Sequence, residues 1–501
     1  MVRRRGEVRT AEGLGRMLQQ GRLVRGMSQR ALAEELGIGQ KWIWEMESGK
    51  PGLFTERLFQ MLRATGVHLY AELDVPDDDA PTTTCPACPT RRTTPMADLR
   101  VELYGYLVGH LRGTDWRSFD FRTAREAFDR FELGSTVLSE SVPLDVVPNR
   151  SRAQRRRNFF GELLPEGRVL TRLATAINVR EHDVVPLLAA YGRDVAGAVQ
   201  IYDPDRPGEP VSPHATPLGD DGVGRLLRGI QAQPLGNAPV TGKSSLAGVQ
   251  EKVVVARLDG AWHQVHDGYP STHIIKLTPP EHPTLIFDEE YGTRIARLLG
   301  LTDRPAWLGD FDGVPGLVIE RYDRSDGGRI HQEDFNQVLG ARGDQKYQAI
   351  GGQVSLRRIA RVFAARGDGA GLGRLLDQLT VAVAVGNLDW HAKNVSLLHP
   401  LDDPAELAPV YDVVPLRHQP NDGAMALAVN GRYAHASLAA DDIAAEGRSW
   451  GVRDAGTRVL DLLERVRAVA AEEEPDERAH PVVAGQIRGF VANLLGGRPA
   501  G

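Results

Sequence analysis

The sequence predicts an α+β fold in two lobes, preceded by a small all-α domain. Short helical runs occupy the first 74 residues, β-rich segments separated by Gly and Pro lie between about residues 206 and 290, and amphipathic helices dominate after about residue 290. Because 501 residues exceed what one hydrophobic core usually organises, we expect several globular units.

The composition is that of an ordinary soluble chain, with 42% hydrophobic and 25% charged residues. The longest apolar stretches, such as residues 379–385, are too short to cross a bilayer, and no sustained apolar segment follows the basic start. The only cysteines, Cys85 and Cys88, exclude a disulfide framework, and no further ligands stand nearby to complete a zinc site. We therefore expect a cytoplasmic protein without a membrane partner and interpret the cysteine pair as incidental.

The middle of the first helical run, SQRALAEELGIGQKWIWEMESGK at residues 28–50, has the outline of two helices joined by a turn. Ser28 is a suitable N-cap, and Gly37 suits the left-handed residue that follows a helix. The second helix would turn Ile43 and Met46 toward the first. Its outer side would carry Gln40, Lys41 and Trp44.

This pattern resembles the repressor-type helix-turn-helix family over roughly residues 11–74. The resemblance implies that double-stranded operator DNA is approached by Gln29, Gln40, Lys41 and Trp44, and that the protein is nucleoid-associated when bound. Residues 1–74 hold twelve basic and nine acidic residues, a local charge of +3 in a chain of net charge −6, which suits a phosphate backbone. An ordinary small helical bundle with a polar face is the alternative.

Composition also divides the rest of the chain. Residues 75–97 lack periodicity and are rich in Pro, Thr and Asp, as flexible linkers are. The expected boundaries are 1–74 for the helix-turn-helix domain, 75–97 for the linker, 98–205 for a small α+β subdomain, 206–325 for a β-rich lobe and 326–501 for a helical lobe.

The strongest chemical signal is GNLDWHAKNVS at residues 386–396, where four residues separate Asp389 from Asn394. Protein-kinase catalytic loops have this spacing: the aspartate accepts or orients the attacking hydroxyl, and the asparagine holds magnesium. Magnesium prefers oxygen ligands that it shares with phosphates, so a further carboxylate should follow, and Asp412 in PVYDVVPL supplies it. Asp389 is thus the predicted catalytic residue, with Asn394 and Asp412 as Mg²⁺ ligands.

Positive charge for nucleotide phosphates is predicted at Lys276, because its HIIK context is like that of the strand lysine of kinases. The chain has only seven lysines among 60 basic residues, and four fall in this candidate site, which favours a specific use of the ammonium group. Upstream, KSSLAGVQEK places small residues before a strand, as a phosphate-binding loop requires. A β-rich lobe followed by a helical lobe completes a bilobal protein-kinase-like fold.

Six segments, SSLAGVQEK, HIIKL, ERYDR, HQEDFNQ, LDWHAKN and PVYDVV, occur in this order and resemble the HipA family of serine/threonine toxin kinases. Two earlier segments, RNFFGELLPEG and YGRDVAGAV, resemble its N-terminal subdomain, so the resemblance spans about residues 98–475. It implies ATP and Mg²⁺ as ligands. The implied nucleotide-binding residues are Ala247, Gly248, Val249, Gln250, Glu251, Lys252, Lys276, Glu320, Arg321, Tyr322, His391, Ala392, Lys393, Asn394, Tyr411 and Asp412.

Ser245 matches the family's regulatory serine. The resemblance implies that its autophosphorylation ejects the phosphate loop and silences the kinase, and the added negative charge beside the ATP phosphates gives a physical reason.

The chain departs from the family in two respects. Trp390 stands where a small or polar residue is usual, and we expect it to narrow the substrate cleft. The helix-turn-helix domain is part of the same polypeptide, whereas the family's antitoxin is a separate partner.

The sequence therefore predicts an ATP- and Mg²⁺-dependent serine/threonine protein kinase that autophosphorylates on Ser245, phosphorylates a protein and inhibits growth. The family suggests a translation component, such as an aminoacyl-tRNA synthetase, as substrate. A homodimer through the N-terminal domain and a separate antitoxin stay open. One alternative is a DNA-binding repressor whose kinase-like part is an inactive nucleotide sensor; another is a small-molecule phosphotransferase.

Overall fold

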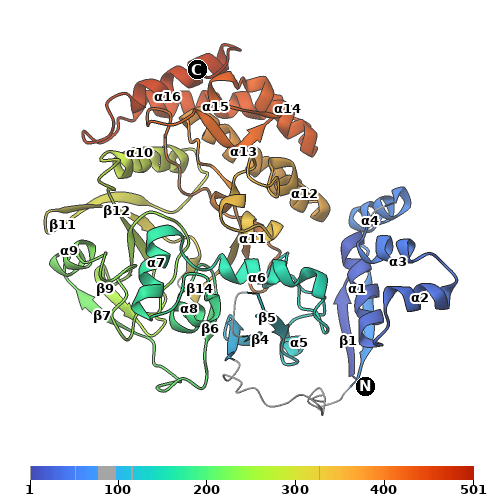
Figure 1. The fold of residues 1–501 in the computed structure, drawn as a ribbon. Coiled ribbons are helices and arrows are strands. Elements are labelled where there is room, and N and C mark those ends of the chain that lie inside the picture. Colours follow the sequence, from blue (N-terminus) through green and yellow to red (C-terminus); the bar gives the residue numbers. More distant parts are fainter. Residues whose placement is uncertain (1, 51, 77–96, 114–116, 326–327) are drawn as a thin grey trace.

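The computed structural model describes residues 2–50, 52–76, 97–113, 117–325 and 328–501, so Cys85 and Cys88 lie outside the described residues. Figure 1 shows an N-terminal unit beside a larger body, in which the last helices of the chain gather at the end opposite the four-stranded sheet. Within the described part, no helix is both long and apolar enough to cross a membrane.

The N-terminal unit contains the predicted helices and, in addition, a two-stranded ribbon. Its elements are β1 (Val2–Glu7), α1 (Ala11–Val24), α2 (Gln29–Leu36), α3 (Gln40–Glu47), α4 (Leu53–Thr65) and β2 (Tyr70–Val75). The strands β1 and β2 pair antiparallel from Val2 opposite Val75 to Glu7 opposite Tyr70, which brings the two ends of the unit together. The sequence prediction did not include this ribbon, because β1 is a single arginine-rich strand without clear alternation.

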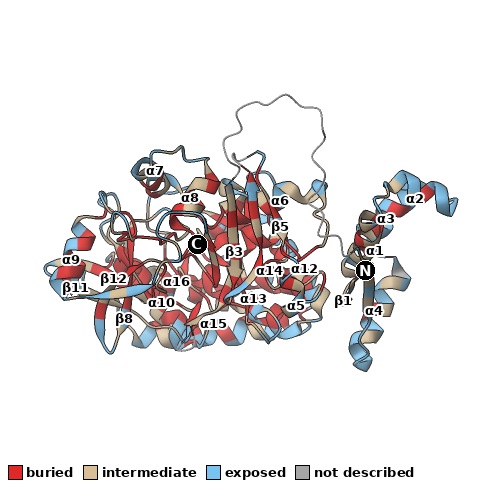
Figure 2. Ribbon diagram, turned by 90° about the horizontal axis from the view of Figure 1, so that it is seen from below, coloured by how far each residue is buried: buried red, intermediate tan, exposed pale blue. Residues whose placement is uncertain are grey.

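The helix boundaries in this unit follow the predicted capping residues. The Ser28 hydroxyl accepts a hydrogen bond from the Ala31 amide, and Gly37 ends α2 with a left-handed φ of 66°. Ile43 is buried, as predicted, but Met46 is 38% exposed and so covers α2 incompletely. Figure 2 shows mostly exposed and intermediate residues in this unit, whereas buried residues concentrate in the body.

The body begins with a small α+β subdomain. Its sheet has the strand order β5-β4-β3-β6, formed by β3 (Ala97–Leu103), β4 (Tyr106–Gly113), β5 (Asp120–Thr123) and β6 (Val199–Tyr202). Its helices are α5 (Ala127–Arg130), α6 (Ala153–Gly161), α7 (Gly167–Ala176) and α8 (Val184–Tyr191). Residues 101–111 thus belong to the β3–β4 hairpin, and the subdomain combines helices with a sheet, as expected for an α+β unit.

A six-stranded sheet follows, with the order β11-β12-β10-β8-β9-β7. The strands are β7 (His214–Leu218), β8 (Lys252–Leu258), β9 (Ala261–His266), β10 (His273–Leu277), β11 (Ala306–Phe311) and β12 (Val314–Glu320), and the helices are α9 (Asp220–Arg228) and α10 (Leu285–Leu298). Alternate residues of β8 enter different cores: Val253 and Val255 pack with α9, and Val254 and Ala256 with the α+β subdomain. The subdomain and this sheet therefore share a core.

The helical lobe contains α11 (Phe335–Leu339), α12 (Leu356–Arg366), α13 (Gly369–Val385), α14 (Ala440–Trp450), α15 (Ala455–Glu472) and α16 (Val483–Leu495). Short strands complete it: β13 (Arg324–Ser325), β14 (Gly328–Arg329), β15 (His331–Asp334), β16 (Ser396–His399), β17 (Glu406–Leu407), β18 (Ala424–Val429) and β19 (Arg432–Ala434). The apolar helix α13 lies at its centre and ends at Gly386, whose φ of 71° turns the chain out of the helix.

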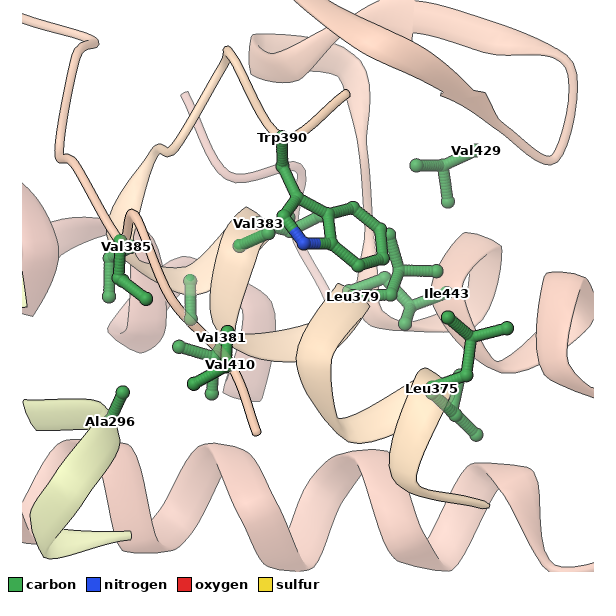
Figure 3. Close-up of a cluster of buried hydrophobic side chains, with 14 of the residues drawn as sticks. Ala296, Leu375, Leu379, Val381, Val383, Val385, Trp390, Val410, Val429 and Ile443 are labelled. Carbon is green, nitrogen blue, oxygen red and sulfur yellow. The ribbon is translucent and has the colours of Figure 1, made fainter. Parts of the chain in front are cut away.

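Trp390 does not narrow a cleft, contrary to the expectation from the sequence. Its side chain is 1% exposed and points into the core of the helical lobe. Figure 3 shows the indole ring among Leu379, Val383 and Ile443, with Val429 nearby. The residue after Asp389 is therefore a packing residue, whereas the Asp389 side chain itself is 47% exposed.

The N-terminal unit docks on the body through β1 and α1. The Leu133 amide donates to the Arg5 carbonyl at 3.0 Å, so β1 lies against the segment that follows α5. The buried side chain of Gln20 pairs with the backbone of Val147 through two hydrogen bonds of 3.0 Å, one in each direction. A Cβ atom at Gly6 would lie 2.1 Å from the Leu133 carbonyl oxygen, so only glycine permits this approach.

Candidate functional site

The loop between α13 and β16 and the segment between β17 and β18 bring the three residues of the predicted magnesium–phosphate site together. Asp389 and Asn394 lie in the loop after α13, where the Asn394 amide nitrogen donates to the Asp389 carbonyl at 2.9 Å. That bond leaves the Asn394 carboxamide oxygen as the atom available to a cation. Asp412 has a left-handed φ of 57°, and its carbonyl accepts a hydrogen bond from Asn387 of the same loop at 3.1 Å. Two loops from the helical lobe thus form one site.

Lys276 joins the sheet to this site. From β10 its ammonium group contacts the Glu289 carboxylate at 2.6 Å and the Asp412 carboxylate at 2.5 Å. Burial alone would raise the pKa of Asp412, but the Lys276 charge lowers it to about 2, so the carboxylate stays ionised. A strand lysine paired with a helix glutamate and close to a metal-binding aspartate is the arrangement of kinase active sites.

Asp389 has a different environment from Asp412. Burial raises the pKa of Asp389 to about 6, and a hydrogen bond from the Tyr347 hydroxyl at 2.9 Å acts in the opposite direction. The side chain is still 47% exposed, so another molecule has access to it. A carboxylate with a pKa just below neutrality is suited to accept a proton from an attacking hydroxyl.

The predicted phosphate loop lies between β8 and the α+β subdomain. The Lys252 ammonium group donates to the Ala247 carbonyl at 2.8 Å, and Gly248 has a φ of 112° that favours glycine. The subdomain contributes the Glu166 amide, which donates to the Gly248 carbonyl at 3.3 Å, and Arg172, which pairs with Glu251. Burial and the nearby Lys276 charge together lower the pKa of Lys252 to about 8.

Ser245 is fully buried at the base of this loop. Its hydroxyl donates to the Leu163 carbonyl at 2.9 Å, and its amide donates to the Asp194 carbonyl at 2.9 Å. The Asp194 side chain accepts a hydrogen bond from the hydroxyl of Ser244, the residue before Ser245, and it forms an ion pair with Arg324. The YGRDVAGAV segment therefore anchors the phosphate loop from below.

Two predicted nucleotide contacts point elsewhere. The Arg321 guanidinium is buried and donates to Asp323, to the Ser271 hydroxyl and to the Val195 carbonyl. The Lys393 ammonium group lies between the Glu162 and Glu166 carboxylates, at 2.8 and 2.7 Å. Both side chains are engaged within the protein. Arg321 could therefore contact a nucleotide only through its backbone, and Lys393 only after its side chain leaves the two glutamates.

The remaining predicted contacts lie at the end of β12 and just after it, in the phosphate loop, in the catalytic loop and beside Asp412. The rings of Tyr322 and Tyr411 lie 5.1 Å apart, and the Tyr411 hydroxyl donates to the Lys393 carbonyl at 2.6 Å. Glu320 pairs with Arg304, and Gln250 donates to the Leu277 carbonyl. His391 and Ala392 are buried in the catalytic loop, whereas Val249 is 57% exposed.

The sequence did not single out several residues that the structure adds to the site. They are Glu289, Tyr347, Glu162, Glu166 and Asp194, each of which contacts a predicted residue across 13 to 231 positions of sequence separation. Glu289 had a local signal, since it lies one helix after the HIIK strand. The others contact the site only through tertiary structure.

The described residues fit Mg²⁺ better than a transition metal. In the part of the chain that the structure describes, no group of three or more His, Cys, Asp and Glu side chains is arranged to hold a metal ion. Asp412 and Asn394 offer oxygen donors only, and magnesium is usually held by one or two such protein groups together with phosphates. The pair therefore fits a cation that arrives with a nucleotide.

The predicted DNA-binding residues differ in their exposure. Gln40, Lys41 and Trp44 are exposed on α3, and Trp44 is 52% exposed. Gln29 instead donates to the Glu47 carboxylate at 2.8 Å, and the same carboxylate pairs with the buried Arg22. Gln29 therefore holds α2 against α1 and α3 in this structure.

Family models match three parts of the chain: a HipA-like C-terminal domain at residues 244–473, a HipA N-terminal domain at 99–202 and a helix-turn-helix domain at 13–74. Y4mE of Sinorhizobium fredii, named as a kinase, is 32% identical over 375 residues, which cover 72% of this chain and 88% of the relative. The serine/threonine-protein kinase toxin HipA of Shewanella oneidensis is 25% identical over 328 residues, covering 62% of this chain and 73% of that protein.

Among solved structures, a HipA chain from Shewanella oneidensis, in a complex of HipA, HipB and operator DNA, matches with a TM-score of 0.62 and 23% identity. The match covers 79% of this chain and 99% of that one, and it shows the fold. The fold and the site thus define a bilobal, kinase-like protein with an N-terminal helix-turn-helix domain. The chain belongs to the HipA family.

Proposed function

We propose that this chain is an ATP- and Mg²⁺-dependent serine/threonine protein kinase. The observation that carries the proposal is the position of Lys276, which binds Glu289 and Asp412 at once while Asp389 lies in the adjacent catalytic loop. Phosphoryl transfer depends mainly on positioning and on charge stabilisation, and this arrangement offers both. Membership of the HipA family, whose members Y4mE and the Shewanella oneidensis HipA are named as kinases, supports it.

Each residue has a role that its surroundings favour. Asp389 accepts the proton of the attacking hydroxyl, because its carboxylate is approachable and only moderately acidic. Lys276 and the amides of the 247–252 loop hold phosphate oxygens. Asp412 and Asn394 would hold Mg²⁺, which neutralises charge on the phosphates when it is bound.

Nucleotide binding tests the site separately from catalysis. With Mg-ATP at about 100 times its Kd, ligand binding should stabilise the wild-type protein by about 2.7 kcal/mol, measured by thermal unfolding. Lys276→Met should lose most of this gain, whereas the matched change Lys50→Met in the N-terminal unit should keep it. If Mg-ATP does not stabilise the wild type at any concentration, the proposed nucleotide site is wrong.

Autophosphorylation on Ser245 is part of the proposal, and its burial adds a requirement. The hydroxyl is closed off by Leu163 and the amide by Asp194, so the loop must open locally before the serine reaches a phosphate. Phosphopeptide mapping should therefore find phosphate on Ser245 only slowly, and faster in Arg172→Ala, which removes the pairing with Glu251. Equal rates in the two proteins would show that this pair does not restrain the loop.

We also propose that the N-terminal unit binds operator DNA through Gln40, Lys41 and Trp44 of α3, which are exposed side by side. The protein substrate is proposed from the family as a translation component, whose modification inhibits growth. Phosphoproteomics after expression of the wild type and of Asp389→Asn identifies it. A target that is modified equally by both would be the substrate of another kinase.

A further inference from the structure

Tyr347 makes the contact that a phosphoacceptor makes in a kinase. Its hydroxyl donates to a carboxylate oxygen of Asp389 at 2.9 Å. In protein kinases, the catalytic-loop aspartate accepts the proton of the substrate hydroxyl that attacks the phosphate. A hydroxyl of the chain itself therefore occupies the hydrogen-bonding position that an acceptor needs.

The ring of Tyr347 is held so that its hydroxyl points to the site. The ring meets His391 of the catalytic loop edge to face, with centroids 5.4 Å apart and planes at 75°. Its amide donates to the Asp344 carbonyl at the end of a 3-10 helix (Gly343–Lys346), and the next amide, of Gln348, donates to Ala426 of β18. The contact with Asp389 is thus fixed from both sides of the residue.

The segment that carries Tyr347 contains four glycines in the left-handed conformation. It connects α11 to α12 and contains Gly340, Gly343, Gly351 and Gly352, all with positive φ between 52° and 75°. Glycines at such positions allow a segment to shift without side-chain strain. Tyr347 is half-buried, so its ring is not locked in a core. A shift of this segment would therefore move the phenol toward or away from a nucleotide bound in the proposed site.

Cationic groups stand beside the phenol. The Lys346 ammonium group lies 5.4 Å from the centre of the Tyr347 ring and 2.9 Å from the Glu166 carboxylate. Glu166 also binds Lys393 at 2.7 Å. A phosphate on Tyr347 would bring close to two negative charges and would compete with Glu166 for Lys346, so the product has a counter-charge beside it.

We propose that Tyr347 is a phosphorylation site that the chain modifies in cis; this rests on the proposed kinase function. The phenol oxygen of Tyr347 bonds to the γ-phosphorus of ATP, the bond from that phosphorus to the bridging oxygen breaks, and ADP leaves with the electron pair. The phenol proton passes to the Asp389 carboxylate. The phosphorylated side chain then covers Asp389, so the modification limits further phosphotransfer.

The test maps phosphate by mass spectrometry after the full-length protein is incubated with Mg-ATP. Phosphate on Tyr347 is expected in the wild type and in Tyr433→Phe, a control on β19, and not in Asp389→Asn. In cis, the fraction of Tyr347 modified per minute stays the same on tenfold dilution of the protein. A rate that falls tenfold on dilution overturns the intramolecular step.

Other outcomes separate this inference from the proposed function. Phosphate on Ser245 or other residues, without any on Tyr347, overturns the inference and leaves the proposed kinase function standing. No phosphate on any residue or added protein overturns both the inference and the proposed function.

A readout without nucleotide tests the geometry: in Asp389→Ala, amide hydrogen exchange at Tyr347 and Gln348 should speed up at least several-fold. Unchanged exchange would show that the hydrogen bond does not hold the segment, and would overturn the premise.

Discussion

At the scale of single residues, the two aspartates of the site are suited to different chemistry because their surroundings differ. Asp412 has an ammonium group at 2.5 Å and is ionised at any physiological pH. Asp389 has a neutral phenol as its hydrogen-bond partner, and burial raises its pKa to about 6. One carboxylate is therefore suited to hold a cation and the other to take a proton.

This difference predicts the pH dependence of phosphotransfer. Only the ionised Asp389 accepts a proton, so kcat should rise about tenfold per pH unit below about pH 6 and level off above about pH 7. Tyr347→Phe removes a hydrogen bond that lowers this pKa, so the rising limb should move to higher pH. A kcat that is flat from about pH 5 to 7.5 would contradict the assignment of Asp389 as the base.

The roles of single residues could be predicted from the sequence only where a motif is local. Asp389, Asn394 and Lys276 lie in short segments whose spacing reflects one loop or strand. Glu162 and Glu166 hold Lys393 from more than 200 positions away, so no local pattern reveals that this lysine is engaged. Trp390 was misread for a related reason, because the sequence gives its position in the loop but not the side of the loop it faces.

At the scale of elements, α10 connects the strand lysine, Lys276, to Asp412, the proposed metal ligand. It carries Glu289, and one turn later Gly292 lies so close to the Val413 backbone that a Cβ atom would be 2.2 Å from the Val413 carbonyl oxygen. The buried Asp288 of the same helix binds His418 at 3.0 Å. Two direct contacts, at Val413 and His418, thus fix α10 against the segment that contains Asp412, and Glu289 is linked to Asp412 through Lys276.

Gly292→Ala should disturb this contact and lower kcat for phosphotransfer at least tenfold, because the helix must move away from Val413. The control is Arg297→Ala, on the exposed side of the same helix, which should keep kcat within about twofold. Circular dichroism and thermal unfolding check that both variants fold. Normal activity of a folded Gly292→Ala protein would show that α10 tolerates the shift.

The packing of α13 predicts a stability effect at Trp390. Trp390→Ala should destabilise the helical lobe by about 3–5 kcal/mol, as for other buried aromatic residues. Trp44→Ala, at a 52% exposed position, should change stability by no more than about 0.5 kcal/mol. Hydrogen exchange of the α13 amides measures the first effect directly. A change at Trp390 no larger than that at Trp44 would contradict the buried position of the indole.

At the scale of the whole molecule, the N-terminal unit is docked on the body rather than only tethered to it. The α+β subdomain contacts it on one side and reaches the phosphate loop and catalytic loop on the other, through Glu166, Arg172 and Glu162. The sequence predicted a helix-turn-helix domain and a linker ahead of the α+β subdomain and the two lobes, but it gave no sign of this contact, because the docking residues belong to no motif. Their partners are mostly backbone groups.

Gln20→Leu should weaken the docking, since it removes both bonds to Val147 and leaves buried backbone groups unpaired, at a cost of about 1–3 kcal/mol each. Hydrogen exchange of the Val147 amide should speed up about tenfold or more. Leu18→Ala, on the exposed side of α1, should leave this amide unchanged. Equal protection in Gln20→Leu would mean that the unit is held by its other contacts.

Binding of the N-terminal unit to DNA should weaken as salt rises, because lysine and arginine contacts release counterions from the phosphate backbone. Lys41→Ala should lower the slope of log affinity against log salt concentration by about one, because one phosphate contact is lost. Titrations of the full-length protein with duplex DNA at several salt concentrations measure both. Binding without any salt dependence would contradict a role of this basic unit in DNA recognition.

The measurement that tests the central claim most directly is transfer of labelled phosphate from Mg-ATP to protein by the wild type and by Asp389→Asn. We expect transfer by the wild type, a loss of about 10²–10⁴-fold in Asp389→Asn, and unchanged stabilisation of both proteins by Mg-ATP. Transfer at the wild-type rate by Asp389→Asn would contradict the account. So would a wild-type protein that binds Mg-ATP and transfers no phosphate to itself or to any protein of a bacterial lysate.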